Sequence, residues 1–187
     1  MDYPDGLAAF AVPEGWTAIR TDPPAHVPSD DDRFLALCRE NACGHWGTNW
    51  GCPPGWNRKL DSLLEEYDSA VLLERTFECT PDDSDAVRRA DEEAHAVVRR
   101  VVADLRASGR RCIGFADGGC GYCGVCSYPE PCRFPGMLVP SISAIGLDLG
   151  RFLDGIGRSL EFRDDRVTLY GLVLYRSGSE RRRERAL

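Results

Sequence analysis

The sequence predicts an α+β fold in which helices pack on a small mixed β-sheet and two cysteine-rich loops bind metal. Short apolar runs indicate strands, and one long stretch with an apolar residue every three or four positions indicates a helix. Seven of the nine cysteines fall into two groups within segments rich in Gly and Pro. The 187 residues, 43% of them hydrophobic, suit a single domain over residues 1–176. Residues 177–187, which contain a run of arginines, are expected to form a disordered tail.

The first half of the chain is expected to contain two strands and two helices. A strand is predicted over Trp16–Thr21, and a short helix over Asp31–Arg39 carries Cys38. Leucines on one face predict a helix over Asn57–Tyr67, and a continuous apolar run predicts a buried strand over Ser69–Phe77.

The second half is expected to begin with the longest helix, Asp85–Ser108, and to return as a strand over Cys112–Ala116. A further helix is predicted near Ser143–Gly155, followed by a hairpin made of Ser159–Arg163 and Arg166–Tyr175. The strand–helix–strand part predicts a right-handed crossover, and the hairpin adds antiparallel partners, so the sheet is expected to be mixed.

The second cysteine group is the more specific metal signal. It reads Cys120-x2-Cys123-x2-Cys126-x5-Cys132, with Pro135 three positions after the last cysteine. Bacterial ferredoxins hold iron–sulfur clusters with a similar run and a fourth Cys followed by Pro. Four cysteines also suit tetrahedral zinc, but zinc sites usually come as two separated pairs. The spacing therefore favours a [4Fe–4S] cluster, with zinc as the alternative.

The first group consists of Cys38, Cys43 and Cys52, and Pro53-Pro54 follows directly. The three cysteines could be a partial metal site or three buried thiols; the prolines fix the chain where it leaves the group, which favours metal ligands. Three cysteines are one short of a closed cluster. The fourth ligand could be Cys79 or Cys112, Cys132 could cross over from the second group, or one iron could be open.

Aromatic residues surround the first group. Trp46, Trp50 and Trp56 bracket Cys52, and their rings are expected either to shield a cluster from water or to pack in the core. His45 is the nearest titratable side chain, as a ligand or as a hydrogen-bond donor. We assign Trp46, Trp50 and His45 as candidate cofactor-binding residues.

Charge and hydropathy narrow the functional classes. The net charge is −7, and no basic stripe runs through the body of the chain, so nucleic-acid binding is not expected. The acidic opening segment 1–5 does not resemble a signal peptide, and no apolar stretch reaches membrane-spanning length. We expect a cytoplasmic protein without membrane contact, where reduced cysteines favour metal binding over disulfides.

The chain resembles the DUF2284 family of predicted metal-binding proteins. The resemblance rests on CGHWGTNWGCPP (43–54), GCGYCGVC (119–126), PCRFP (131–135), PSISAIGLD (140–148) and YGLVL (170–174). It implies a cysteine-bound, iron–sulfur centre but no particular reaction. The family usually has Met-Glu after the serine, where this chain has Ile142-Ser143, so any role of that glutamate is missing here.

These observations predict an iron–sulfur protein with one or two [4Fe–4S] clusters. It would act in electron transfer or in reductive chemistry at an open cluster iron, as an oxidoreductase or another cluster-dependent enzyme. Its expected partner is a redox protein or a small-molecule substrate. The alternative is a zinc-stabilised protein-binding module without catalysis.

Overall fold

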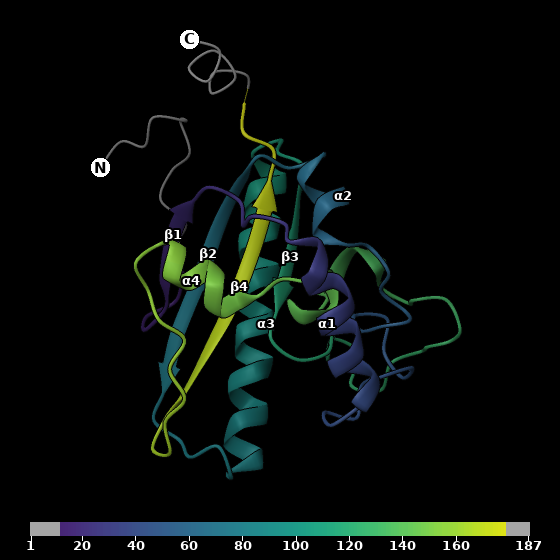
Figure 1. Ribbon diagram of the computed structural model, residues 1–187, viewed down its shortest axis with the longest axis vertical. Helices are drawn as coiled ribbons and strands as arrows, with labels where there is room; N and C mark the ends of the chain where they lie inside the picture. Colours follow the sequence, from purple (N-terminus) through teal and green to yellow (C-terminus); the bar gives the residue numbers. More distant parts are fainter. Residues whose placement is uncertain (1–11, 179–187) are drawn as a thin grey trace.

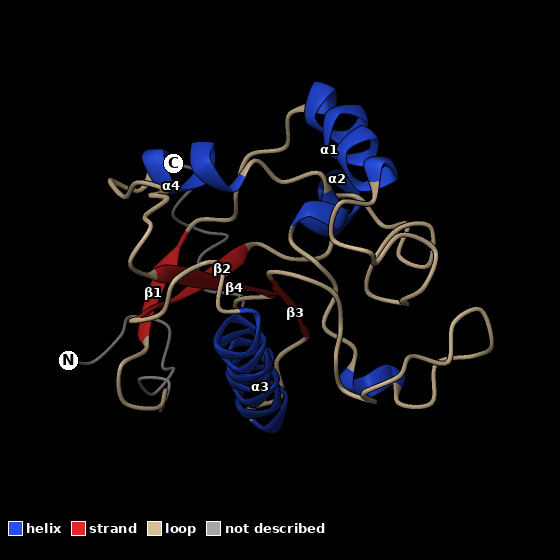
Figure 2. Ribbon diagram, turned by 90° about the horizontal axis from the view of Figure 1, so that it is seen from below, coloured by secondary structure: helices blue, strands red, loops and turns tan. Residues whose placement is uncertain are grey.

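The computed structural model describes residues 12–178 and confirms the α+β class. Four strands form one sheet, and helices pack on both of its faces (Figures 1 and 2). No helix within residues 12–178 is long and apolar enough to cross a membrane. The elements in chain order are β1 (Thr17–Thr21), α1 (Pro28–Glu40), α2 (Leu60–Leu64), β2 (Ser69–Phe77), α3 (Ser84–Ala107), β3 (Cys112–Ala116), the 3-10 turns η1 (Pro135–Met137) and η2 (Ser143–Ile145), α4 (Leu149–Gly155) and β4 (Val167–Tyr175).

The expected tail begins inside the described part of the chain. Ser177 is buried, and its backbone N–H donates a hydrogen bond of 2.7 Å to the Asp68 carboxylate. Residues 179–187, where the rest of that tail was expected, lie outside the described residues, as do residues 1–11.

The strand order is β1-β2-β4-β3, and every neighbouring pair of these strands is antiparallel. β2 and β3 run in the same direction and are joined through α3, but β4 lies between them. The sheet is therefore antiparallel rather than mixed as expected. β4 lies between β2 and β3, and seven of its nine residues are buried.

Helix α3 covers one face of the sheet, while α2, α4 and η2 cover the other (Figure 2). The α3 face is closely packed, since a Cβ built on Gly114 of β3 or on Gly171 of β4 would lie 2.4 Å from a Val98 methyl group. Glycine at both positions lets α3 approach β3 and β4, and the second cysteine loop begins shortly after β3.

Two expected elements are wrong. Residues 159–163 form no strand: Leu160 packs beside α4, where its side chain would lie 3.8 Å from a Cβ built on Gly150. The helix expected over Ser143–Gly155 is interrupted at Gly146, whose φ of +76° is left-handed. It becomes η2 and α4, and Asp148 caps α4 by accepting a hydrogen bond from the Arg151 N–H.

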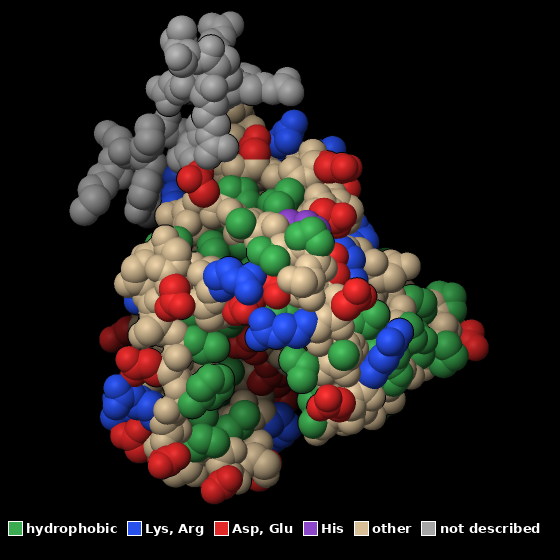
Figure 3. Space-filling model, viewed as in Figure 1, with side chains coloured by type: hydrophobic (Ala, Val, Ile, Leu, Met, Phe, Trp, Pro, Cys, Tyr) green, Lys and Arg blue, Asp and Glu red, His purple; other side chains and the backbone are tan. Residues whose placement is uncertain are grey.

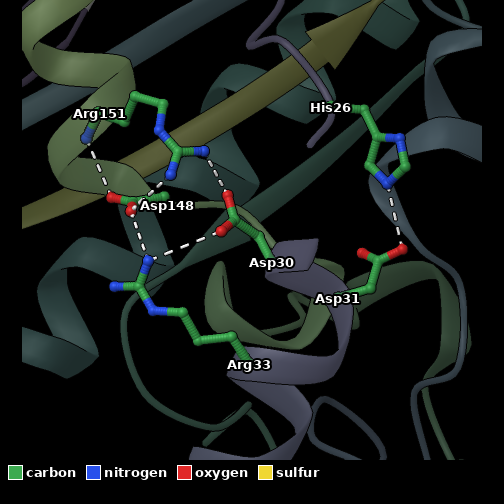
Figure 4. A network of polar contacts seen from close by, with 6 residues as sticks. All are labelled: His26, Asp30, Asp31, Arg33, Asp148 and Arg151. Atoms are coloured by element: carbon green, nitrogen blue, oxygen red, sulfur yellow. Dashed lines mark hydrogen bonds and ion pairs between the residues drawn. The ribbon is translucent and has the colours of Figure 1, made fainter. Parts of the chain in front are cut away.

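A polar network fixes the first turn of α1 (Figure 4). The buried Asp30 carboxylate accepts a 2.5 Å hydrogen bond from Arg151 of α4. Arg33 donates to Asp148 at 3.0 Å, so both helices are joined by crossed ion pairs. These ion pairs hold the start of α1. The last turn of the same helix carries Cys38, next to the loop that contains Cys43 and Cys52.

Candidate metal centre

Both cysteine groups lie beyond the β3 edge of the sheet, on the right of Figures 1 and 2. Cys38 is on the last turn of α1, whereas Cys43 and Cys52 are in the loop that follows. The second group occupies the loop after β3. The segment that follows this loop returns to the first, where Ser141 donates a backbone hydrogen bond of 2.9 Å to Gly51. The fold therefore brings the two cysteine groups to one side of the molecule.

The four thiols of the second group line a single pocket. Trp50, Tyr122, Phe134 and Leu138 complete most of its apolar wall, while the cysteines that line it are Cys120, Cys123, Cys126 and Cys132. Cys132 therefore stays with its own group rather than crossing to the first. Within residues 12–178, no three His, Cys, Asp or Glu side chains converge closely enough to hold one metal ion. The four thiols share a cavity without meeting at one point.

The segment 49–51 of the first loop packs directly on the second group. The Asn49 amide donates to the Cys120 carbonyl at 2.8 Å, and its oxygen accepts from the Gly51 N–H at 2.7 Å. The Trp50 N–H points to the Cys126 sulfur at 3.5 Å. A Cβ built on Gly51 would lie 3.0 Å from both Cβ and N of Cys120, so only glycine fits without displacement.

Cys52 lies at the centre of this arrangement. Burial, and to a smaller extent neighbouring thiolates from both groups, raise the pKa of its thiol to about 12. The neighbours are Cys43, Cys38, Cys120 and Cys126. Crowded thiols that oppose one another's ionisation are suited to a cation, which replaces their protons and balances their charge. The donor set therefore fits a thiolate-bound metal centre.

Cys38 experiences a similar but milder environment. Burial raises the pKa of its thiol, Cys43 adds to this effect, and the positive charge of Lys59 opposes it. The Lys59 ammonium also donates to the Ala144 carbonyl at 3.5 Å. The positively charged side chain of Lys59 thus lies beside the first group.

The structure places neither Cys79 nor Cys112 with the first group. Cys112 begins β3, four residues or about 13 Å from the end that leads into the second loop, and its thiol donates to the Val102 carbonyl at 3.4 Å. Cys79 follows β2, on the other side of β4 from β3. The first group therefore retains three cysteines.

The candidate aromatic residues have different surroundings. Trp50 donates from its indole N–H to the Glu130 carbonyl at 2.8 Å and packs edge-on against Tyr128. Trp46 lies under the Arg39 guanidinium, 5.9 Å from the ring centroid. Trp56 packs against Phe115 in the core. Trp50 is thus part of the second group's pocket, although it is close to Cys52 in sequence.

His45 lies against the second loop. A Cβ built on Gly119 would be 3.1 Å from Cγ of the imidazole and 3.2 Å from Nδ1. The ring therefore belongs to the junction between the two groups.

Sequence reasoning missed a polar stripe on α3 that faces the second loop. Its members are Asp91, His95 and Arg99, spaced by four residues so that they share one helix face. The His95 side chain is 2% exposed, and its Nε2 is 2.9 Å from the Asp117 carbonyl, while Nδ1 has no hydrogen-bond partner. Three polar residues at this spacing inside an otherwise apolar helix face were the available signal.

Two carboxylic acids next to the second cysteine loop, Asp91 and Asp117, have raised pKa values. Burial and the nearby Asp117 and Glu92 raise the pKa of Asp91 to about 7, although Arg99 opposes this effect. Burial also raises the pKa of Asp117 to about 6, against a hydrogen bond of 2.9 Å from the Tyr170 N–H. A Cβ built on Gly118 would lie 3.0 Å from Oδ1 of Asp91, so the loop begins in contact with the stripe.

The comparisons agree with a metal site. The family described as "Predicted metal-binding protein (DUF2284)" matches residues 24–175, a range that contains both cysteine groups. Neither the curated proteins nor the solved structures give a match.

Proposed function

We propose that this chain, which belongs to the DUF2284 family of predicted metal-binding proteins, binds iron–sulfur clusters through its two cysteine groups. The observation that carries the proposal is the pocket lined by all four thiols of the second group. A [4Fe–4S] cluster takes one cysteine on each of four irons, so the four thiols around this pocket match its ligand number. The cavity between them is about 10 Å³, so the loop has to open to admit a cluster. The spacing of the four cysteines in the sequence supports the same assignment.

In this proposal the second centre is a closed one-electron relay. Cys120, Cys123, Cys126 and Cys132 hold the cluster, while Trp50 and Leu138 limit the access of water. Large apolar side chains are exposed on the same loop, with Val125 82% exposed and Phe134 49% exposed. Figure 3 shows hydrophobic side chains gathered on this side of the molecule. We assign this surface to contact with a redox partner protein.

The first centre is proposed as the place of chemistry. Cys38, Cys43 and Cys52 supply three ligands, and an iron without a cysteine acts as a Lewis acid that binds a small molecule. Cys43 is exposed, which leaves a route for such a molecule, and Lys59 places a positive charge beside Cys38. The protein would then be an oxidoreductase that reduces a small substrate, in a reducing compartment such as the cytoplasm.

The test is the metal content of protein purified without oxygen. Iron and acid-labile sulfide are measured per chain, together with zinc. About eight irons with matching sulfide supports two clusters, and about four supports one. Zinc in place of iron, without sulfide, contradicts the proposal and favours a zinc-stabilised binding module instead.

A further inference from the structure

Arg99 of α3 reaches the second cysteine loop with one donor group unused. Its guanidinium lies over the ring of Tyr122, 5.1 Å from the ring centroid. Tyr122 lies between Cys120 and Cys123 in the sequence. Its Nη1 is buried and has no hydrogen-bond partner in the protein. Leaving a charged donor buried without an acceptor is unfavourable, so the position of this group requires an acceptor from outside the chain.

The charges around Arg99 indicate what kind of acceptor fits. Burial lowers the pKa of the guanidinium, and the negative charges that oppose this effect are Cys120 first, then Tyr122 and Asp91. Asp91 is a weak counter-ion, because its own pKa is raised to about 7 and part of it is protonated at neutral pH. The thiolate side of the pocket is therefore the main source of negative charge for Arg99.

We propose that Arg99 is a positioning residue for the metal centre of the second group. Its guanidinium holds a positive charge and a free N–H beside Cys120, where four thiolates give a bound cluster its net negative charge. Hydrogen bonds and positive charge near cluster sulfurs stabilise the reduced form, which is the more negative one. Arg99 therefore raises the reduction potential and slows metal loss. This inference rests on the proposed function, since it requires metal at the second group.

A purely structural role for Arg99 makes a different prediction. If the side chain only supported Tyr122, its replacement would loosen the loop without a specific effect on the electron affinity of the centre. Arg100 provides the matched control, because it is the next residue on the same helix and is exposed. Removing its charge alters the net charge equally, but solvent and salt screen that change.

The experiment is an anaerobic redox titration of the wild type, Arg99→Gln, Arg99→Lys and Arg100→Gln, followed by EPR. We expect Arg99→Gln to lower the reduced-to-oxidised ratio at a given potential about tenfold, which is about 59 mV for one electron. The ratio for Arg99→Lys should fall between those of the wild type and Arg99→Gln, since an ammonium keeps the charge but lacks the planar guanidinium. Arg100→Gln should match the wild type. Equal shifts in Arg99→Gln and Arg100→Gln would overturn the inference.

Loss of metal to a chelator gives a second readout that needs no redox signal. Arg99→Gln should lose metal severalfold faster than the wild type, whereas Arg100→Gln should not. If Arg99→Gln does not fold, Arg99→Lys decides: a lower potential or faster loss supports the inference, and wild-type values overturn it.

The wild-type metal content separates this inference from the proposed function. Zinc without iron would end the iron–sulfur proposal, while the rate of zinc loss would still test Arg99. A wild type without metal at the second group overturns both.

Discussion

The two cysteine groups differ in how the chain supplies their ligands. The second group takes all four cysteines from one loop, and all four line one pocket. The first group combines the end of α1 with the following loop and brings only three, of which Cys43 is exposed and Cys52 is buried. One loop can close around a metal centre, because it provides every ligand locally. A helix end and a loop fix fewer ligands and leave one side accessible.

The comparison also shows that neither group is independent. The segment 49–51 of the first loop contacts Cys120 and Cys126, and Cys52 lies within the electrostatic field of both groups. In the proposed function, this contact between the two loops would give the two centres a short path for electron transfer.

The largest expected effect is that of Cys123→Ser. Metal binding supplies folding free energy to loops that have no regular structure of their own, so this variant should lose the metal of the second centre and much of its soluble yield. Metal analysis and the yield of soluble protein measure the change. Cys112→Ala is the control and should keep its metal, because its thiol contacts the Val102 carbonyl in the core.

The outcome can contradict the assignment in two ways. Unchanged metal content in Cys123→Ser would remove the second site. If Cys112→Ala abolished an iron–sulfur signal while Cys38→Ala did not, the assignment of the first group would be wrong.

The second expected effect separates the open centre from the closed one. Cyanide or sulfide added to the reduced protein should perturb the EPR signal of one cluster, because an iron without a cysteine has room for an added ligand. The perturbation should be absent in Cys43→Ala and retained in Cys123→Ser wherever that protein is soluble. If no signal responds to either ligand, both centres are closed and electron transfer alone is the better account.

The smallest expected effect concerns the segment 49–51, through which the first loop contacts the second cysteine group. Asn49→Ala leaves the Cys120 carbonyl and the Gly51 N–H without their partner, which should lower the free energy of unfolding by about 1–3 kcal/mol. Denaturant unfolding measures the loss. Thr48→Ala is the control, since its exposed hydroxyl makes only a long contact of 3.3 Å with the Gly44 carbonyl. Equal losses in both variants would mean that Asn49 does not hold the two loops together.

Local patterns in the sequence were sufficient for several elements. β2 and β3 have the predicted bounds, and α3 begins and ends one residue before its prediction. Apolar periodicity depends only on neighbours along the chain, so such elements are readable from sequence. The grouping of the cysteines is likewise a property of spacing, and the family match over residues 24–175 agrees with it.

Tertiary pairing decided what local patterns could not. Residues 159–163 and 166–175 looked like a hairpin, yet only Val167–Tyr175 became a strand, because Leu160 packs beside α4 instead of extending the sheet. The pattern predicted a strand over Arg166–Tyr175 but not which strands would flank it.

The sequence by itself determined the fold class, the long helix and the two sets of thiols. Only the tertiary structure decided that Asn49 and Trp50 serve the second group, and that Arg99 of α3 reaches Tyr122. These contacts join residues that are 23 to 76 positions apart. The physical reason is that side-chain chemistry and short-range periodicity are local, whereas the neighbours of a loop depend on how the whole sheet is assembled.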